Sequence, residues 1–449
     1  MSPRSLFGMI SNRADLVRSP GHDAACRALV DGISAAHPRR VVEQSVTGED
    51  GRLRVGDGTY DVGDYERILV LGGGNAAGTA ATALETVLGD RLDGGVVVTD
   101  DPTETERIEI VEGTHPLPSE ANVAGTERVL ETARAADERT LALVVVTGGG
   151  SALLADPAVG VDLSAYRELT DALVTSGATI DEINAVRKHL SGIKGGQLAD
   201  ELAPATTVGL LFSDVVGNRE DVIASGPISP DDTTDGDARA VVDRYDLDVS
   251  GDIDEALTGG EHGDRAETPG PGDSAFERVE THVLADNQTA LDAAAASLRE
   301  DGYRAVVLAA DIEGEARDVG GVHAAIANRC AASGEPFEPP VALLSGGETT
   351  VTVAGSGAGG PNQEFALSAA LDLESGLVAA VDTDGIDGAT DAAGAMLDSS
   401  VIENEREARA ALDANDVRPC LDELGALVET GQTGTNVNDL RLLLVGEPE

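Results

Sequence analysis

The sequence predicts an α/β protein of two domains, with mainly parallel sheets covered by helices. Units of strand, glycine turn and helix recur along the chain, which is the pattern of such folds. Continuous apolar runs such as Leu143 to Val146 are typical of strands buried on both faces. A length of 449 residues corresponds to two or three domains. We expect a Rossmann-like N-terminal domain over 1–235, an acidic Gly/Pro-rich linker over 236–279, and a C-terminal α/β domain over 280–449.

The charge of the chain is strongly negative. Acidic residues outnumber basic ones 81 to 31, and the formal net charge is −50. The acids are interleaved with periodic apolar segments, which argues against disorder. A charge this large indicates an acidic surface adapted to high salt, where ions screen self-repulsion. It also argues against nucleic acid as the main partner.

The compartment follows from the cysteines and from the apolar segments. Three cysteines (Cys26, Cys330 and Cys420) lie far apart, so neither a disulfide framework nor a CxxC metal site is indicated. The N-terminal residues lack the long apolar run of a signal peptide, and no stretch approaches 18 apolar residues. We expect a soluble, cytoplasmic protein with no membrane partner.

In chain order, the first nucleotide-like signal follows helically spaced residues at 5–36. A buried strand, Ile68 to Leu71, leads into the glycine turn 72–74 and an Ala-rich helix. This arrangement presents backbone N–H groups to a phosphate. Ala77 stands where the third glycine of G-x-G-x-x-G would be, so the signal is weak, and the alternative is a tight packing turn.

A second strand–glycine turn is the stronger candidate for a phosphate-binding loop. Gly148, Gly149 and Gly150 can approach a ligand closely, and Ser151 adds a hydroxyl donor. Asp214 follows a later strand, at the end where open α/β sheets bind ligands. It is a candidate base or metal ligand, with a helix or turn cap as the alternative.

The segment 179–202 contains both lysines of the chain. Thr179 and Glu182 form a capping box, and apolar residues recur at helical spacing. A helix through Lys194 would place its cations and small polar groups on one side: Asn184, Arg187, Lys188, Ser191 and Lys194. Because lysine is absent elsewhere, we expect an anion-binding site, with a solvated basic face as the alternative.

After Thr281 the pattern of strand, turn and helix restarts. The glycine turn at Gly346 and Gly347 is tightly framed by strands. Asp382, Asp384 and Asp387 follow a later strand in a loop that contains glycine. Mg²⁺ in proteins takes one or two carboxylates together with phosphate oxygens and water, so this loop suits it. We expect the glycine turns and the acids to face one inter-domain cleft that holds the active site.

Eight stretches together resemble class II glycerate kinase, also called glycerate 2-kinase, of the MOFRL/DUF4147 family. They run in one order along the chain: EGTHPLPSE, TGGGSALL, IDEINAVRKHLSGIKGGQLA, SDVVGN with IASGPISPDDTT, LSGGETTVTV, NQEFALSAAL, DTDGIDGATDAAGA and TGTNVNDL. The resemblance implies two α/β domains and transfer of the γ-phosphoryl group of ATP, with Mg²⁺, to the 2-hydroxyl of D-glycerate. It implies ATP and D-glycerate as partners, and a homodimer is one oligomeric state among those left open.

The resemblance also implies roles for individual residues. The candidate catalytic residues are Arg187, Lys188, Lys194 and Asp214. The candidate phosphate-binding residues are Gly148, Gly149, Gly150, Ser151, Gly346, Gly347 and Glu348. The candidate substrate-binding residues are Asn75, Asn184 and Asn362, and the candidate metal ligands are Asp384 and Asp387.

Two positions depart from the family pattern. Asn75 stands where the first glycine turn usually has lysine, and Pro361 stands where a later motif usually has arginine. Both missing cations would face phosphate or carboxylate. An alternative is therefore a family member without glycerate kinase turnover, acting on another hydroxy acid or as a sensor. A third hypothesis, hydroxypyruvate reductase, would need a nicotinamide site.

We predict that the protein loses structure on dialysis to low salt and regains it in KCl. The reason is the repulsion of like charges, which reaches beyond ~10 Å below ~0.1 M ionic strength. Circular dichroism and thermal unfolding between 0.05 and 3 M KCl measure this. An unchanged spectrum and midpoint across that range would contradict adaptation to high salt.

Overall fold

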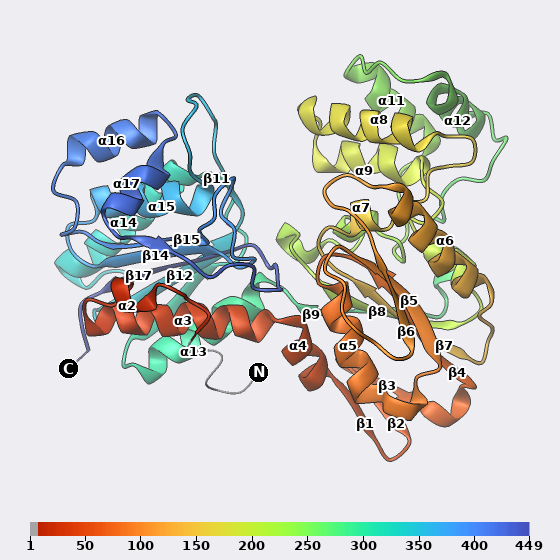
Figure 1. Ribbon diagram of the computed structural model, residues 1–449, viewed down its shortest axis with the longest axis horizontal. Coiled ribbons are helices and arrows are strands. Elements are labelled where there is room, and N and C mark those ends of the chain that lie inside the picture. Colours follow the sequence, from red (N-terminus) through yellow and green to blue (C-terminus); the bar gives the residue numbers. More distant parts are fainter. Residues whose placement is uncertain (1–7, 449) are drawn as a thin grey trace. The chain divides into compact units, whose positions relative to one another are not determined.

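The computed structural model describes residues 8–448, and the chain forms two compact units (Figure 1). The inserted unit comprises Val41–Leu284. The terminal unit comprises Met1–Arg40 and Ala285–Glu449, so it contains both ends of the chain. No helix among residues 8–448 combines the length and apolarity needed to cross a membrane.

The inserted unit is built on a six-stranded sheet with the order β6-β5-β4-β7-β8-β9. The four pairings from β6 to β8 are all parallel. The strands are β4 (Arg67–Gly73), β5 (Gly94–Thr99), β6 (Ile108–Glu112), β7 (Thr140–Val146), β8 (Thr206–Phe212) and β9 (Val279–Ala285). A separate antiparallel sheet contains β1 (Val46–Glu49), β2 (Arg52–Val55) and β3 (Gly58–Asp61).

The strand order places a topological switch point between β4 and β7. Counted from β4, the order is 3-2-1-4-5-6, that of doubly wound dinucleotide-binding folds. In open α/β sheets, ligands bind outside the carboxyl ends of the strands at this point. The glycine turns after β4 and after β7 therefore lie where the topology favours a ligand.

Helices cover both faces of this sheet. On one face, alternate strand residues pack in a core cluster with α6 and α10. The strand residues between them are equally buried on the other face, where α5 packs on β4, β5 and β7. A second cluster joins α8, α9, α11 and α12 into a helical layer. The helices are α4 (Pro38–Ser45), α5 (Ala77–Leu88), α6 (Glu120–Arg134), α7 (Gly150–Leu153), α8 (Leu163–Thr175), α9 (Ile180–His189), α10 (Gln197–Leu202), α11 (Asp235–Arg244) and α12 (Gly251–Glu261).

The terminal unit is a three-layer sandwich on a second six-stranded sheet, of order β10-β12-β17-β14-β15-β16. Its strands are β10 (Arg304–Ala309), β12 (Val341–Gly347), β14 (Leu377–Asp382), β15 (Gly394–Asp398), β16 (Leu427–Val428) and β17 (Asp439–Val445). A two-stranded ladder pairs β11 (Gly314–Glu315) with β13 (Thr349–Thr350). Alternate residues of β17 face opposite layers, since Leu442 and Leu444 join one cluster and Leu443 joins the other.

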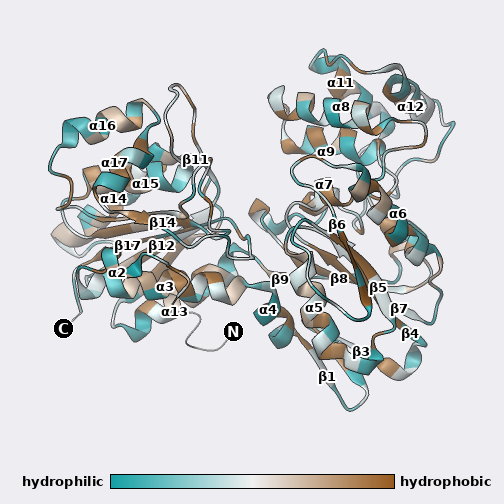
Figure 2. Ribbon diagram, viewed as in Figure 1, coloured by the Kyte–Doolittle hydropathy of each residue, from teal (hydrophilic) through white to brown (hydrophobic). Residues whose placement is uncertain are grey.

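The helices of the terminal unit lie on both sides of its sheet. One layer contains α2 (Arg13–Leu16), α3 (Pro20–Ala36) and α13 (Asn287–Glu300), and the other contains α14 (Ala316–Ser333), α15 (Pro361–Asp372), α16 (Glu405–Asp413) and α17 (Val417–Glu423). The central strands are mainly hydrophobic, whereas the helices carry many hydrophilic residues (Figure 2). Residues 5–7 of the expected N-terminal helical segment lie outside the described residues.

The second sheet corrects the expectation of mainly parallel sheets. Only the β10–β12 pairing is parallel, and the other four are antiparallel. The final strand β17 inserts antiparallel between β12 and β14. Continuous apolar runs indicate that both faces of a strand are buried, but they do not indicate the direction of the strand. A mixed sheet between two helical layers is buried on both faces as well.

The domain boundaries also differ from those expected. The N-terminal helix α3 packs on α13 and β17, so the first 40 residues complete the terminal unit. The expected linker at 236–279 instead contains most of α11 and all of α12. Val241, Val242, Ile253 and Leu257 bury these helices against α8 and α9. The acids that made this segment resemble a linker include exposed ones on the outer side, such as Asp243 and Asp248.

We predict that Gly72→Ala destabilises the inserted unit by about 2 kcal/mol or more. Gly72 has φ +128°, and a Cβ there would lie 1.9 Å from the carbonyl oxygen of Val145 on the neighbouring strand. Urea unfolding in molar KCl measures the change. The matched control is Gly251→Ala at the first turn of α12, where nothing lies within 4 Å. Equal effects of the two substitutions would contradict this packing argument.

Candidate active site

The basic segment begins as the sequence predicts but ends earlier. Thr179 caps α9, and Glu182 returns the bond to the backbone of Thr179, as expected for a capping box. The helix ends at His189 rather than continuing through Lys194. The expected arc of cations on one helix side is therefore wrong, because Ser191 and Lys194 lie in the turn that follows.

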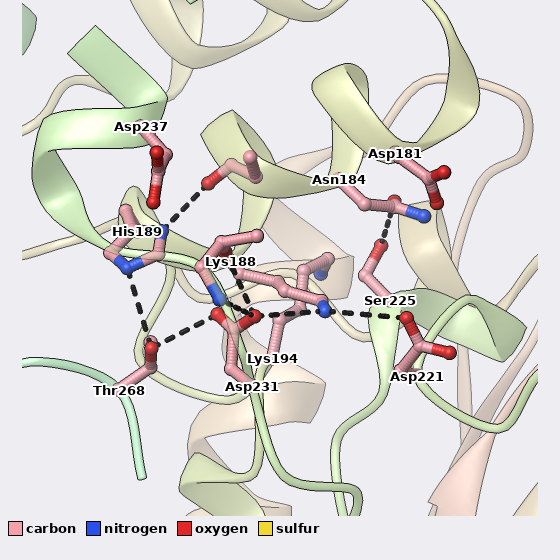
Figure 3. Close-up of polar contacts among 12 residues, drawn as sticks. Asp181, Asn184, Lys188, His189, Lys194, Asp221, Ser225, Asp231, Asp237 and Thr268 are labelled. Atoms are coloured by element: carbon pink, nitrogen blue, oxygen red, sulfur yellow. Dashed lines mark hydrogen bonds and ion pairs between the residues drawn. The ribbon is translucent and has the colours of Figure 1, made fainter. Parts of the chain in front are cut away.

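Lys188 is buried and paired rather than exposed. Its side chain is only 4% exposed, and its Nζ donates to Oδ1 of Asp231 at 3.1 Å (Figure 3). Oδ2 of Asp221 lies 4.0 Å from the same nitrogen. Burial alone would raise the pKa of Asp231, but Lys188 and the donors of Thr233 outweigh it and hold that pKa below its usual value. The alternative of a solvated charge is wrong for this lysine, because its side chain is buried. Its role in anion binding stays a prediction.

Lys194 lies deeper still. The residue has no exposed surface, and its Nζ donates to the carbonyl oxygen of Leu154. Burial lowers the pKa of Lys194 to about 7, and Arg187 lowers it further, against the opposing effect of Asp156. Arg187 is itself half-buried, and burial lowers its pKa. The charge of Arg187 thus acts on Lys194 in the interior, whereas Lys188 pairs with Asp231.

The two glycine turns at the switch point bind each other. The N–H of Asn75 donates to the carbonyl of Gly148 at 2.8 Å, and the N–H of Ala76 donates to Oγ1 of Thr147 at 3.2 Å. Gly149 adopts φ +75°, and a Cβ there would lie 1.8 Å from Oδ1 of Asn75. That oxygen is buried and has no hydrogen-bond partner among the described residues.

The second turn keeps its donors free. In residues 8–448, the backbone N–H groups of Gly148, Gly149 and Ser151 have no acceptor, whereas that of Gly150 is bound to the carbonyl of Thr147. Three unpaired N–H groups in one glycine turn are the donor set that binds an anion. The sequence favours this turn over the first as a phosphate-binding loop, and that role stays a prediction.

A chain of side chains joins this turn to α9. The Ser151 hydroxyl lies 2.9 Å from the Ser225 hydroxyl, which donates to Oδ1 of Asn184 at 2.9 Å. The Nδ2 of Asn184 is buried without a partner in the described part of the chain. Ala224 and Ser225 both have positive φ, 51° and 61°. Strained residues of this kind persist where the surrounding structure holds them, often at functional sites.

Asp214 also lies beside the second glycine turn. It follows β8, and its carboxylate packs on Gly148, where a Cβ would lie 2.2 Å from Oδ2. Burial raises the pKa of Asp214 to about 6. A carboxylate with such a pKa beside an anion-accepting turn is suited to take a proton near neutral pH.

The terminal unit has its own polar group where β12, β17 and β14 meet. Asp439 is paired in the sheet with Gly347 on one side and with Asp382 on the other. It accepts from Asn362 at 2.5 Å and from the backbone of Thr349 at 3.2 Å, and it contacts Arg441. Asp439 is thus the acceptor that joins these strands to the start of α15.

The predicted metal ligands have different surroundings. Asp387 accepts the N–H groups of Asn362 and Gln363, both at 2.9 Å, and so caps α15. Burial raises the pKa of Asp387 to about 7, against these donors. Burial also raises the pKa of Asp384 and, with repulsion from Asp384 and Asp439, that of Asp382. Asp387 therefore serves as a helix cap, whereas burial and the nearby Asp384 carboxylate raise the pKa of Asp382. The metal-binding roles of Asp384 and Asp387 stay predictions.

The third glycine turn is a packing feature. A Cβ on Gly346 would lie 1.6 Å from Oδ1 of Asn287, and one on Gly347 would lie 2.3 Å from the backbone of Ile312. The carbonyl of Gly346 accepts from Arg441 at 3.1 Å and from Ile312 at 3.1 Å. Glu348 is exposed. The contacts of these two glycines serve packing, and their phosphate-binding role stays a prediction.

Sequence reasoning missed four residues with structural importance: Ser225, Asp231, Asp439 and Arg441. Only Arg441 carries a local signal, because an arginine inside an apolar strand must find an acceptor. Asp231 and Asp439 are two acids among 81 and cannot be distinguished by composition.

The fold and these groups define an α/β protein whose inserted unit places a glycine turn with unpaired N–H groups and a buried carboxyl group, that of Asp214, at the switch point of a doubly wound sheet. Residues 24–258 match the family described as Domain of unknown function (DUF4147), and residues 341–439 match the MOFRL family. The chain belongs to this family, as the resemblance indicated.

The chain is similar to known proteins over most of its length. A D-glycerate 2-kinase of Thermotoga maritima is 40% identical over 85% of this chain and 91% of its own length. A protein of Agrobacterium vitis that carries the name of a hydroxypyruvate reductase is 39% identical over 94% of this chain and 98% of its own. A crystal structure of glycerate kinase from T. maritima superposes with a TM-score of 0.83 at 37% identity, covering 94% of this chain and 99% of that one.

We predict that Lys194→Met changes the pH dependence of stability. The folded pKa of Lys194, about 7, lies below the unfolded value of 10.5. Between these values the unfolded state binds more protons, so the wild type gains stability relative to the variant as pH rises from 7 to 10.5. Urea midpoints of both proteins across that range measure the difference. A constant difference would show that Lys194 titrates normally.

Proposed function

We propose that the protein transfers the γ-phosphoryl group of ATP to the 2-hydroxyl of D-glycerate, as a glycerate 2-kinase. The supporting observation is the set of unpaired N–H donors at Gly148, Gly149 and Ser151, with Asp214 packed on Gly148. Phosphoryl transfer depends mainly on positioning and on neutralising charge, and such donors do both. Family membership with a 40% identical D-glycerate 2-kinase supplies the substrate class.

In this proposal Asp214 is the base. The substrate hydroxyl oxygen attacks the γ-phosphorus, the bond from that phosphorus to the bridging oxygen of ADP breaks, and the hydroxyl proton goes to the Asp214 carboxylate. A pKa of about 6 leaves Asp214 ionised at pH 7 and still basic enough to accept a proton. Asn184, through its unpartnered Nδ2, and Asn75, through its unpartnered Oδ1, are available to polar groups of the substrate.

Lys188 acts indirectly. Because it is paired with buried Asp231, it holds α9 in place and so orients Asn184 one turn earlier, on the same side of the helix. Lys194 donates to Leu154, which ends the helix α7 begun by the glycine turn. Both lysines are therefore positioning residues for the turn and for Asn184.

Mg²⁺ is the metal that a kinase of this class implies, and the acids of the terminal unit fit it. Asp382 and Asp384 each accept one backbone N–H, at 3.1 and 2.7 Å, and burial together with the charge of Asp384 raises the pKa of Asp382. One or two carboxylates at such a place are the protein ligands that Mg²⁺ takes. When bound, Mg²⁺ would neutralise phosphate charge. Asn362 is held by Asp387 and Asp439, so its Oδ1 has no partner of its own in the described residues.

A second candidate is a family member without glycerate kinase turnover. Asn75 contributes no charge beside the phosphate-binding turn, and Pro361 forms the first turn of α15 in place of a cation. Losing two cations would lower the rate of phosphoryl transfer more than it would weaken substrate binding. Substrate binding by the neutral donors would be less affected.

One feature of the fold favours the reductase hypothesis. Asp100 and Asp101 follow β5, the position of a ribose-binding acid in dinucleotide folds. However, the N–H groups of Asn75 and Ala76 after β4 are bound to the second turn. They are unavailable to a pyrophosphate, so the geometry favours the kinase.

We predict that kcat/KM for D-glycerate decreases as the pH is lowered through about 6, the pKa of Asp214. Asp214→Asn should remove this acidic limb and lower kcat about 100-fold or more. A coupled assay with ATP, Mg²⁺ and D-glycerate in molar KCl measures it across pH 5–9. Asp248→Asn, at an exposed position of the same unit, is the control. A limb that persists in Asp214→Asn would assign the base elsewhere.

We predict that Asn75→Lys raises kcat, by about tenfold or more, because it restores a cation beside the phosphate-binding turn. Asn75→Gln, which has no charge, is the matched control. Activity in Asn75→Lys alone, with none in the wild type, would establish the second candidate. Equal rates in wild type and in Asn75→Lys would show that the departure at position 75 does not limit turnover.

A further inference from the structure

We propose that His189, Asp235 and Glu267 form a binding site for a divalent transition-metal ion such as Zn²⁺, separate from the kinase chemistry. One ligand atom from each residue lies within 4.8 Å of the other two. They come from the end of α9, the start of α11 and the segment after α12. An ion there would tie these parts of the helical layer together.

His189 is oriented as a metal ligand. Its Nδ1 lies 2.8 Å from the carbonyl oxygen of Ala185. A carbonyl only accepts, so Nδ1 carries the hydrogen and Nε2 of the neutral ring presents a lone pair. Ligating histidines are commonly fixed in this way by a backbone carbonyl. Nε2 lies 3.3 Å from Oε2 of Glu267 and 3.3 Å from Oγ1 of Thr268.

Asp235 provides the observation that points to a missing cation. Its side chain has no exposed surface, and Arg265 contacts only Oδ1. Oδ2 is buried and has no partner among residues 8–448. An ionised oxygen left unpaired in the interior is costly unless a cation or donor reaches it.

Glu267 supplies the third ligand and the access from solvent. Its side chain is 47% exposed, and Oε2 accepts the N–H of Asp235 at 3.0 Å. Two ligands bound to one tetrahedral zinc ion at 2.0–2.2 Å lie about 3.4 Å apart, close to the separation of Oε2 and Nε2. The Asp235 oxygen, which lies within 4.8 Å of both, would move inward to join them on one ion.

The charges around the site select the kind of ion. Arg265 balances one of the two carboxylates, so neutral His189, Asp235, Glu267 and Arg265 together carry one negative charge. An imidazole nitrogen with two carboxylates suits Zn²⁺ or Co²⁺ better than Mg²⁺, which prefers oxygen ligands and keeps its waters. The competing arrangement has no metal, with a protonated His189 paired to Glu267.

The site also contacts the ion pair formed by Lys188 and Asp231. Oγ1 of Thr268 lies 3.0 Å from Oδ2 of Asp231 and 3.3 Å from Nε2 of His189 (Figure 3). An ion bound to His189 would fix Thr268 and, through it, the acceptor of Lys188. The expected consequence is greater thermal stability.

The test uses the full chain, stripped with chelator and dialysed into 2 M KCl, which screens loose binding to the acidic surface. Equilibrium dialysis with Zn²⁺ and the visible spectrum with Co²⁺ are the readouts. We expect one tightly bound ion per chain, a Co²⁺ spectrum of low coordination number, and a higher melting temperature with Zn²⁺. Affinity should fall at least tenfold in Glu267→Gln and in Asp235→Asn.

Glu267→Gln is the main variant because its half-exposed side chain can be changed with little risk to folding, whereas Asp235→Asn is buried. Glu261→Gln, an exposed acid at the end of α12, is the matched control and should bind as the wild type does. Absence of a bound ion in the wild type would overturn the proposal. Equal binding by wild type and Glu267→Gln would also overturn it, because the ion would then be held by surface acids.

Discussion

The structure of the inserted unit depends on the close approach of two backbone turns at the switch point of its sheet. Glycines at 72, 74 and 149 leave no room for a side chain, because each hypothetical Cβ would lie about 2 Å from the neighbouring turn or strand. This proximity allows the turn after β4 to bind the turn after β7 through two hydrogen bonds. The first turn therefore supports the second, whose N–H groups at Gly148, Gly149 and Ser151 have no acceptor among the described residues. The same glycines that resembled a dinucleotide fingerprint serve here mainly to bring the two turns together.

The charge distribution explains why the chain keeps only two lysines. Its acidic residues outnumber its basic ones, and arginine supplies the exposed cations. Examples are the ion pairs of Arg219 with Asp181 and of Arg244 with Glu182. Both lysines are buried instead, one against a carboxylate and one against a carbonyl oxygen. A compact ammonium fits a small interior site that a planar guanidinium would not. The scarcity of lysine thus pointed to two buried polar contacts, and in the function proposed above these contacts position the neighbouring groups.

The terminal unit is organised by a buried charge in a similar way. Arg441 stands inside an apolar strand, and Asp439 two residues earlier neutralises it. Because β17 lies between β12 and β14, this pair reaches both neighbouring strands and the start of α15. The last strand of the chain consequently sets the positions of acids that lie about 55 residues earlier, including Asp382 and Asp384.

The sequence alone determined the elements and the family. Apolar runs, glycine turns and capping residues are local signals, and they located β4, β7, the N-terminal cap of α9, and the Gly148–Ser151 turn. What it could not determine depends on contacts between distant residues. The direction of β17, the addition of α3 to the terminal unit and the folding of α11 and α12 result from packing that no local pattern records. The pairing of Lys188 with Asp231 was equally hidden, because 81 acids offer many partners and only tertiary structure brings one of them into the interior beside this lysine.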